Sequence, residues 1–483
     1  MSLHLYDTKA QALREFTPLQ PGRVGIYLCG PTVQSEPHVG HLRSALVYDQ
    51  LRRWLEVKGL QVTLVRNVTD IDDKVLTNAV ERGQEWWALA YQMELAFSSA
   101  YRALCIAPPT YEPRATASIP EMLALIERLI SAGYAYQATD GSADVYFAAS
   151  KWAEYGELTR QKLEDMADTG DAETRGKLDP RDFTLWKASK PGEPATAAWS
   201  SRFGLGRPGW HIECSAMSTK YLGSAFDIHG GGLDLRFPHH ENELAQSRAA
   251  GDEFANFWLH NGLVNVNGQK MSKSLGNSIF AADLLAKGTP LAVRFWLGSA
   301  NYRSVLDYSE NSLVEAQANV DRIAGFLDRA VRFLATAGAT WFAEAQPPMP
   351  ALANLLPAEF SAAMDDDLNI PVALSAIFDG VRAGNSAIDA GDTASAEKHA
   401  KQVRAMLIVL GIDPLGAEWA DQTGGNAAEH QALDSLIQSL LGQRAQARAN
   451  KDFARADEIR DQLSAAGIVL SDSADATHWS VNG

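Results

Sequence analysis

Residues 24–41 read VGIYLCGPTVQSEPHVGH and are the strongest indicator of the fold. Residues 24–28 are apolar and rich in β-favouring side chains, which predicts a buried strand. A Gly-Pro turn follows, and the amphipathic run over residues 42–58 predicts a helix. Strand, turn and helix start indicate an α/β sheet, and the backbone N–H groups at such a helix N-terminus attract anions.

Two short motifs are candidates for binding polyphosphate. His38-Val39-Gly40-His41 offers two imidazoles that can donate to phosphate oxygens, and a glycine that lets a planar base approach the backbone. Lys270-Met271-Ser272-Lys273-Ser274 offers two mobile ammonium groups, and its hydroxyls can bind phosphate or cap the next helix. Each motif alone is weak evidence, because paired histidines and basic pentapeptides are common in turns. Both motifs in this order along one chain favour a nucleotide site.

The two motifs resemble the HIGH and KMSKS signatures of class I aminoacyl-tRNA synthetases, with valine in place of the first motif's isoleucine. The resemblance implies a Rossmann-like sheet that binds ATP with Mg²⁺, carboxylate attack on the α-phosphate, and transfer of the aminoacyl group to tRNA. It assigns catalytic roles to His38, His41, Lys270 and Lys273. The ATP contacts that it implies are His38, Gly40, His41, His229, Gly230, Gly231, Gly232, Asp234, Lys270, Ser272, Lys273 and Ser274.

The chain has three cysteines, Cys29, Cys105 and Cys214, and no pattern of a disulfide framework. Neither a signal peptide nor a membrane-length apolar stretch is visible, so a cytoplasmic protein without membrane association is expected. A lone cysteine is most often a small buried hydrophobe, and this alternative applies to all three thiols.

A metal site is the other interpretation of two of these thiols. His239 and Glu243 are four residues apart on one face of a predicted helix, and His240 is an equally near donor. Two thiolates, an imidazole and a carboxylate can hold zinc in tetrahedral geometry, but the spacing alone does not decide the ligand set.

Longer runs resemble the cysteinyl-tRNA synthetase branch of the family. They are GRPGWHIECSAM at 206–217, FDIHGGGLDL at 226–235 and FPHHENE at 237–243. The resemblance implies one Zn²⁺ per chain, held by Cys29, Cys214, His239 and Glu243. Zinc would separate L-cysteine from serine by taking up the substrate sulfur, which an apolar pocket cannot do for so close an analogue.

Cys29, Thr69 and Trp210 are the expected substrate contacts. Trp210 precedes Cys214 by four residues and so shares its face of a predicted helix, although a core tryptophan is an equal alternative. Thr69 lies near the end of the second predicted strand, but the acidic run after it could instead cap a helix.

The predicted fold is α/β: a Rossmann-like parallel-sheet catalytic domain with a helical insertion, followed by an α-helical bundle and a small C-terminal anticodon-binding module. A chain of 483 residues exceeds one domain. The expected ranges are 1–83 for the first half of the catalytic domain, 84–199 for the insertion, 200–308 for the second half with the KMSKS loop, 309–422 for the bundle, and 423–483 for the module, after a Gly-rich hinge at 423–426.

The tail over residues 448–460 resembles the anticodon-binding segment of bacterial cysteinyl-tRNA synthetases, with Phe453 where the family often has tryptophan. The tRNA contacts that it implies are Arg448, Phe453, Asp457 and Asp472. On charge pattern alone, a salt-bridged helix surface explains this tail better. The net charge of −16 does not exclude RNA, because binding depends on local charge.

The expected partners are L-cysteine, ATP and tRNA(Cys), and the expected state is a monomer. Two alternatives are a ligase that joins cysteine to an amino sugar in mycothiol synthesis, and a catalytically silent RNA-binding paralogue. The length beyond about Ser309 argues against the first, and the complete HVGH and KMSKS motifs argue against the second.

Overall fold

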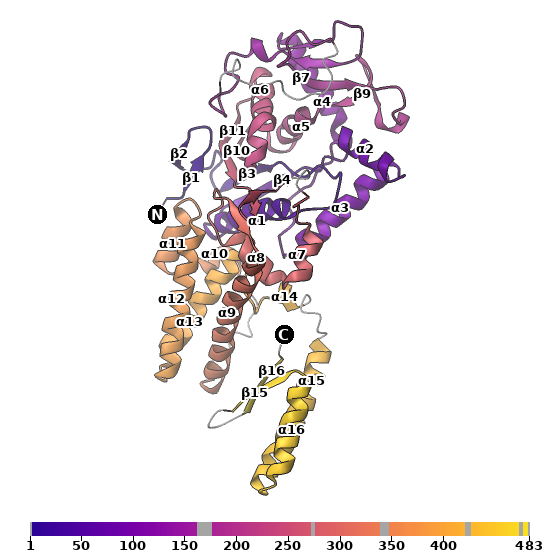
Figure 1. Ribbon diagram of the computed structural model, residues 1–483. Coiled ribbons are helices and arrows are strands. Elements are labelled where there is room, and N and C mark those ends of the chain that lie inside the picture. Colours follow the sequence, from indigo (N-terminus) through magenta and orange to yellow (C-terminus); the bar gives the residue numbers. More distant parts are fainter. Residues whose placement is uncertain are drawn as a thin grey trace. The chain divides into compact units, whose positions relative to one another are not determined.

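The computed structural model describes residues 2–161, 176–271, 276–338, 347–420, 427–472 and 477–481. The chain divides into two compact units, Met1–Gly416 and Ala417–Gly483. Figure 1 shows the helices and strands of both units. The hinge expected at 423–426 lies outside the described residues.

A parallel sheet of four strands lies at the centre of the first unit, as the sequence predicted for the catalytic domain. Its order is β11-β10-β3-β4, so the third and fourth strands in space come from the start of the chain. The strands are β3 (Arg23–Leu28), β4 (Gln61–Arg66), β10 (Ala225–Gly232) and β11 (Phe254–Asn261). In Figure 1, α1 (Val39–Val57) lies on one side of this sheet, and α5 (Trp210–Leu222) and α6 (Glu241–Ala249) lie on the other.

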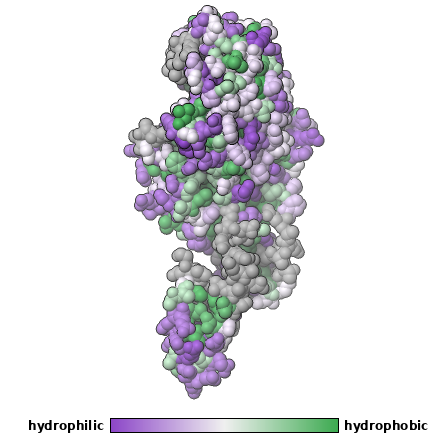
Figure 2. Space-filling model, turned by 90° about the vertical axis from the view of Figure 1, so that its right-hand side faces the viewer, coloured by the Kyte–Doolittle hydropathy of each residue, from purple (hydrophilic) through white to green (hydrophobic). Residues whose placement is uncertain are grey.

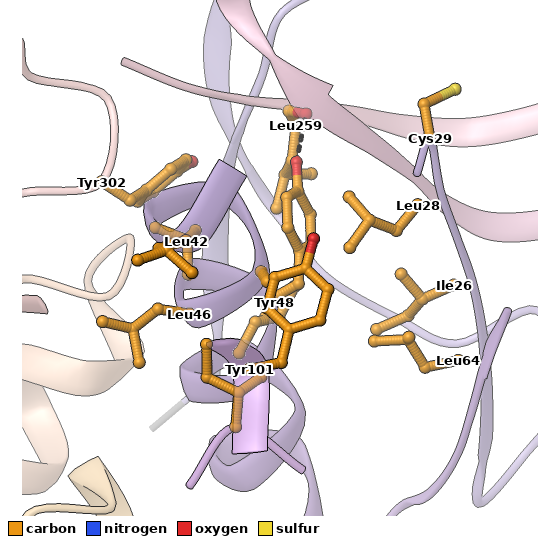
Figure 3. Close-up of a cluster of buried hydrophobic side chains, with 14 of the residues drawn as sticks. Ile26, Leu28, Cys29, Leu42, Leu46, Tyr48, Leu64, Tyr101, Leu259 and Tyr302 are labelled. Atoms are coloured by element: carbon orange, nitrogen blue, oxygen red, sulfur yellow. Dashed lines mark hydrogen bonds between the residues drawn. The ribbon is translucent and has the colours of Figure 1, made fainter. Parts of the chain in front are cut away.

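Helix α1 begins within the HVGH motif, and the motif itself satisfies the exposed N–H groups of the helix start. The His38 side chain accepts from the N–H of Gly40 at 3.2 Å, and His41 Nδ1 accepts from the N–H of His38 at 3.2 Å. Figure 3 shows Leu42 and Leu46 of α1 in one buried cluster with side chains of β3 and β4. The position of the motif is therefore fixed by the apolar helix behind it.

The insertion combines the expected helices with more strand than the sequence indicated. Helix α2 (Asp73–Glu81) precedes the insertion, and α3 (Trp86–Ala103) and α4 (Ile119–Ser131) lie within it. A sheet of five strands in the order β5-β6-β7-β9-β8 follows. Its strands are β5 (Ala135–Gln137), β6 (Val145–Phe147), β7 (Phe183–Ala188), β8 (Trp199–Ser201) and β9 (Gly204–Pro208). Only the β6 segment was expected. The three-residue strands β5 and β8 leave almost no periodic signal, and the longer β7 and β9 were missed as well.

A small sheet of order β13-β12-β14 joins the parallel sheet to the bundle. It comprises β12 (Val264–Val266), β13 (Gln269–Lys270) and β14 (Leu306–Tyr308), with α7 (Ala281–Lys287) and α8 (Pro290–Gly298) between the last two. The bundle comprises α9 (Glu310–Thr336), α10 (Met349–Leu352), α11 (Ala358–Asp365), α12 (Ile370–Asp389) and α13 (Thr393–Leu410). At the N-terminus, β1 (His4–Asp7) and β2 (Ala12–Glu15) form a hairpin.

The second unit is small and has a core of its own. Its elements are α14 (Ala417–Ala420), α15 (Ala427–Ala449), α16 (Phe453–Ala465), β15 (Ile468–Asp472) and β16 (Thr477–Val481). Ile437 and Leu441 of α15 pack with Ile459 and Leu463 of α16 and with Ile468. On the face drawn in Figure 2, apolar residues of this unit gather beside a hydrophilic edge.

None of the helices in the described part of the chain combines the length and the apolar character needed to cross a lipid bilayer.

Candidate functional site

A cavity of about 410 Å³ lies at the carboxyl ends of the four parallel strands. Residues that end or follow each strand line it: Cys29 after β3, Thr69 after β4, Gly232 in β10 and Asn261 in β11. Ligands of open α/β sheets bind at this edge, outside the carboxyl ends of the strands. The cavity is therefore the candidate substrate site.

Both candidate phosphate-binding motifs reach this cavity. His38, Gly40 and His41 line it, and the two imidazole rings stack with their centroids 3.6 Å apart. Lys270, at the end of β13, lines it from another side. The predicted ATP contacts Ser272, Lys273 and Ser274 lie outside the described residues. The structure thus brings the helix start and the first lysine of the second motif to one space.

The predicted ATP contacts between His229 and Asp234 divide into two groups. Gly232 and Asp234 line the cavity, whereas residues 229–231 are not among the described residues that line it. A Cβ atom at Gly230 would lie 2.2 Å from a ring carbon of Tyr48, and one at Gly231 would lie 2.9 Å from His240. Packing against these two rings therefore explains both glycines, and the predicted ATP contacts of residues 229–231 stay predictions.

The four predicted metal ligands meet in a buried group beside the cavity. Ligand atoms of Cys29, Cys214, His239 and Glu243 all lie within 4.8 Å of one another. The two sulfur atoms are 3.6 Å apart, Cys29 Sγ is 3.3 Å from Glu243 Oε1, and His239 Nε2 is 3.0 Å from the same oxygen. Three of them also line the cavity, namely Cys29, Cys214 and His239. In Figure 3, the sulfur of Cys29 points away from the apolar cluster.

Four separate elements supply these ligands, which is why spacing in the sequence could not identify the set. Cys29 follows β3, and Cys214 lies in the second turn of α5. His239 belongs to the short π-helical turn Arg236–His240, and Glu243 lies in the first turn of α6. The ligands are brought together by the sheet and by the packing of α5 against α6.

The charges in this group favour a bound cation. Burial opposes ionisation of the Cys214 thiol, but the hydrogen bond from Cys29 and the charge of His239 lower its pKa to about 6. Burial also opposes protonation of His239, but the Glu243 and Cys214 anions raise its pKa to about 10. Burial and the neighbouring anionic groups raise the pKa of the Cys29 thiol well above its usual value. Burial and like charges thus oppose ionisation of the two thiols. A divalent cation would offset this cost, because it stabilises both thiolates.

Further histidines surround the ligands. His229 Nε2 lies 2.8 Å from Glu243 Oε2, and His211 Nδ1 lies 3.0 Å from His239 Nδ1. Cys29, His229, His240 and Glu243 form a second group whose donor atoms also lie within 4.8 Å of one another. Partners of this kind orient metal ligands and fix the tautomer of a ligating histidine. His239 rather than His240 faces the two cysteines, which is the choice that the sequence alone left open.

Trp210 and Thr69 both line the cavity close to the ligand group. The Trp210 ring stacks on His239 with the centroids 4.3 Å apart. The Thr69 hydroxyl donates to Glu213 Oε2 at 2.8 Å. The acidic run after Thr69 also caps a helix, as the alternative interpretation expected: Asp72 precedes α2 and accepts from the N–H of Lys74.

Family models match the chain in three segments. The model of the tRNA synthetases class I (C) catalytic domain matches residues 15–318, the DALR domain matches 359–414, and the Cysteinyl-tRNA ligase anticodon binding domain matches 430–479. The Cysteine--tRNA ligase of Clavibacter sepedonicus is 61% identical over 489 residues, which is 100% of each chain. That of Micrococcus luteus is 57% identical over 494 residues and covers 99% of each.

The chain belongs to the cysteine–tRNA ligase family.

Solved structures of other synthetases share the fold at low identity. Mycobacterium tuberculosis methionyl-tRNA synthetase in complex with methionyl-adenylate aligns with a TM-score of 0.56 at 17% identity, over 81% of this chain and 90% of that one. The ternary complex of Agrobacterium radiobacter K84 agnB2 LeuRS-tRNA-LeuAMS aligns with a TM-score of 0.58 at 12% identity, over 85% and 86%. These likenesses concern the α/β architecture, which agrees with the predicted fold class.

The predicted tRNA contacts lie in the second unit. Phe453 starts α16 and is 62% exposed, and Arg448 lies in the last turn of α15. Asp457 pairs with Arg460 at 3.2 Å, which is the salt-bridged surface that the charge pattern also allowed. Asp472 ends β15, and its side chain lies outside the described residues.

Asn67 holds the cavity wall together, although no motif in the sequence pointed to it. Its side chain accepts from the N–H of Gly30 at 2.8 Å and donates to the Thr69 hydroxyl at 3.2 Å. Asn67 also lines the cavity and thus braces the turns after β3 and β4 against each other. The one signal for Asn67 in the sequence is its place beside the end of a predicted strand. Polar residues at such places have many roles, so this signal alone does not identify a site residue.

Proposed function

We propose that this chain activates L-cysteine with ATP to form cysteinyl-adenylate and transfers the cysteinyl group to tRNA(Cys). One observation carries the proposal: a buried group of two cysteines, a histidine and a glutamate adjoins the cavity that the HVGH motif lines. A sulfur-selecting group and a phosphate-binding helix start are the two parts that adenylation of cysteine requires. The close relatives bear the name Cysteine--tRNA ligase over their whole length.

The donor set fits zinc. Two sulfurs, one imidazole nitrogen and one carboxylate oxygen lie within 4.8 Å of one another, and all four residues are buried. Thiolate and imidazole are preferred zinc ligands, and a carboxylate is an acceptable fourth. Cys29, Cys214, His239 and Glu243 would hold the ion. Bound there, zinc supplies a borderline-soft Lewis acid that favours a thiolate over a hydroxyl.

The residues of this chain then position two substrates in one cavity. Trp210 would form the wall of the amino-acid pocket near His239, and Thr69 would line its other side. His38 and His41, at the N-terminus of α1, would donate to phosphate oxygens as the cysteine carboxylate attacks the α-phosphate in line. Lys270 and Lys273 would bind the departing pyrophosphate, with Mg²⁺ sharing its charge. No side chain needs to act as a nucleophile, because positioning and charge stabilisation suffice.

The test uses the purified full chain and compares two amino acids and two acceptors. Radiolabelled cysteine should be transferred to tRNA(Cys) in an ATP-dependent reaction, and radiolabelled serine should not. Glucosaminyl-inositol should receive no cysteine. Transfer to the amino sugar would favour the mycothiol ligase, and transfer to neither acceptor would contradict the proposal as a whole.

A paired substitution tests the metal group. Cys214→Ser should remove most bound zinc and raise KM for cysteine together, because a serine hydroxyl is a poor zinc ligand. Cys105→Ser is the matched control, since Cys105 is the one cysteine of the chain outside the group. Zinc is measured by atomic absorption, and KM by cysteine-dependent pyrophosphate exchange. Wild-type zinc content in Cys214→Ser would contradict the assigned ligand set.

A further inference from the structure

The segment between α11 and α12 contains a buried carboxylate that the reaction described above does not use. Asp367 is 3% exposed and lies in the run Met364–Asn369. Its Oδ1 accepts from the backbone N–H of Tyr6 and from the Tyr302 hydroxyl, both at 2.8 Å. Its Oδ2 accepts from Arg303 Nε at 2.7 Å. One carboxylate of the bundle thus binds both the N-terminal strand and the segment that precedes β14.

The backbone at this position is unusual. Asp367 has a φ of +54°, and Leu368 has a φ of +50°. Two consecutive non-glycine residues in the left-handed region are strained, and they persist only where their surroundings hold them. The Asp367 N–H donates to the His4 carbonyl at 3.0 Å, which adds a backbone tie to the three side-chain bonds.

The segment that Asp367 holds is bonded in turn to the HVGH helix. Arg43 follows His41 by two residues in α1 and is 1% exposed. Arg43 Nη2 donates to the carbonyls of Asn301 at 3.3 Å and Ser304 at 2.6 Å, and Nη1 donates to that of Leu263 at 3.0 Å. Within the described residues, these hydrogen bonds go to backbone carbonyls alone. The orientation of α1 near the cavity therefore depends on where residues 301–304 lie.

The same segment supports the cavity wall and the strand that carries Lys270. The N–H of Gly262 donates to the Tyr302 carbonyl at 2.7 Å, and the N–H of Leu306 donates to the Leu263 carbonyl at 2.9 Å. Next to these bonds, β14 pairs with β12, and β12 pairs with β13, where Asn265 faces Lys270. Gly262 and Leu263 line the cavity. Figure 3 places Tyr302 in the same buried cluster as Leu42 and Leu46 of α1.

We infer that Asp367 is a positioning residue for ATP activation, acting through residues 301–308 on the HVGH helix start and on Lys270. This inference rests on the proposed adenylation of cysteine. Asp367 touches neither motif itself. It holds a segment that is bonded to α1 through Arg43 and to the strand of Lys270 through β12. The bundle is thereby coupled to the nucleotide half of the cavity. The metal ligands come from other elements, namely the end of β3, α5, the turn Arg236–His240 and α6.

Asp367→Asn tests the inference, since asparagine keeps one carbonyl oxygen for Tyr6 and Tyr302 and loses the ion pair with Arg303. In cysteine-dependent pyrophosphate exchange, kcat should fall about 10- to 100-fold, because small misplacements of phosphate-binding groups are costly. KM for ATP should rise, while KM for cysteine and zinc content should stay at the wild-type values. Asp366→Asn is the matched control, because the neighbouring Asp366 side chain is exposed, and it should leave all four values unchanged.

A melting curve separates this role from a purely structural one. If Asp367→Asn melts at a lower temperature but has wild-type exchange kinetics well below that temperature, the inference is overturned. If Asp367→Asn does not fold, Tyr302→Phe removes one of the bonds and should lower kcat in the same direction by a smaller factor. Wild-type kinetics in Tyr302→Phe would then overturn it. Absence of exchange in the wild-type chain would instead contradict the proposed function.

Discussion

At the residue scale, His38 serves the fold and the proposed chemistry with one side chain. Its imidazole accepts from the N–H of Gly40 as the N-cap of α1, and it also lines the cavity. Such a double role means that a simple alanine substitution cannot tell loss of folding from loss of phosphate binding.

His38→Asn separates the two roles, because asparagine is among the best N-cap residues and has no imidazole. We expect the melting temperature to stay near that of the wild type, while kcat of pyrophosphate exchange falls about 10²- to 10³-fold, as for other donors to a developing anion. His38→Ala should lose the same activity and also about 1 kcal/mol of stability. Wild-type exchange in His38→Asn would mean that His38 only caps the helix.

At the element scale, buried arginines hold α1 at two places along its length. Near its start, Arg43 of α1 binds the carbonyls described above. Further along, Asp49 of α1 accepts from Arg294 Nη2 of α8 at 2.5 Å and from Arg53 Nε at 2.9 Å. Arg294 also donates to carbonyls of Leu104 and Leu410, so that this single guanidinium joins α1 and α8 to the C-terminal ends of α3 and α13.

Asp49→Asn should destabilise the first unit by about 3–5 kcal/mol, because it leaves the fully buried Arg294 without its counter-ion. The matched control is Glu56→Gln on the same helix. Glu56 pairs with Arg52 at 2.8 Å, and both side chains are partly exposed; an exposed i,i+4 pair contributes about 0.3–0.5 kcal/mol. Melting temperatures of the two variants measure the difference. Equal small effects would show that the buried pair contributes little to stability.

The effect of Asp49→Asn on stability should depend on pH. Burial would raise the pKa of Asp49, but Arg294 and Arg53 outweigh it and hold the pKa below its ordinary value. The stabilisation is therefore fully present above the unfolded-state pKa of about 4 and is lost as the pH falls through the lower native pKa. The gap in melting temperature between the wild type and Asp49→Asn should be constant above about pH 5 and should narrow below about pH 4. A gap that stays constant into acid would contradict the assigned shift.

These long-range ion pairs and hydrogen bonds are the part of the structure that the sequence could not predict. The first strand, the helix start at HVGH and the parallel sheet could be predicted, because adjacent residues carry their signals. The predicted ligand residues converge in one group, yet a resemblance and not a spacing selected them. Asp49, Arg294 and Asp367 could not be found, since each has a charged partner more than 60 residues away in the chain. The separation of 245 between Asp49 and Arg294 is an example. Of the insertion sheet only the β6 segment was expected: β5 and β8 are too short to leave a periodic signal, and the longer β7 and β9 were missed as well.

At the scale of the whole molecule, the cavity, its motifs and the metal group all belong to the first unit, and the predicted anticodon contacts belong to the second. Activation of cysteine and recognition of tRNA can therefore be separated by point substitutions. The family model for anticodon binding covers 430–479, inside the second unit.

Phe453→Ala should weaken tRNA recognition and leave cysteine activation unchanged. Phe453 is 62% exposed at the start of α16, and an exposed ring can stack on an unstacked base, which contributes about 1–3 kcal/mol. KM for tRNA(Cys) in aminoacylation should rise about 5- to 150-fold, whereas pyrophosphate exchange, which needs no tRNA, should keep its kinetics.

Leu436→Ala is the matched control, because Leu436 is 65% exposed in the same unit and has no aromatic face. Phe453→Trp should bind tRNA at least as tightly as the wild type, since an indole stacks over a larger area. If Phe453→Ala and Leu436→Ala raise KM equally, the effect comes from apolar contact or folding of the unit, and base stacking on Phe453 is excluded.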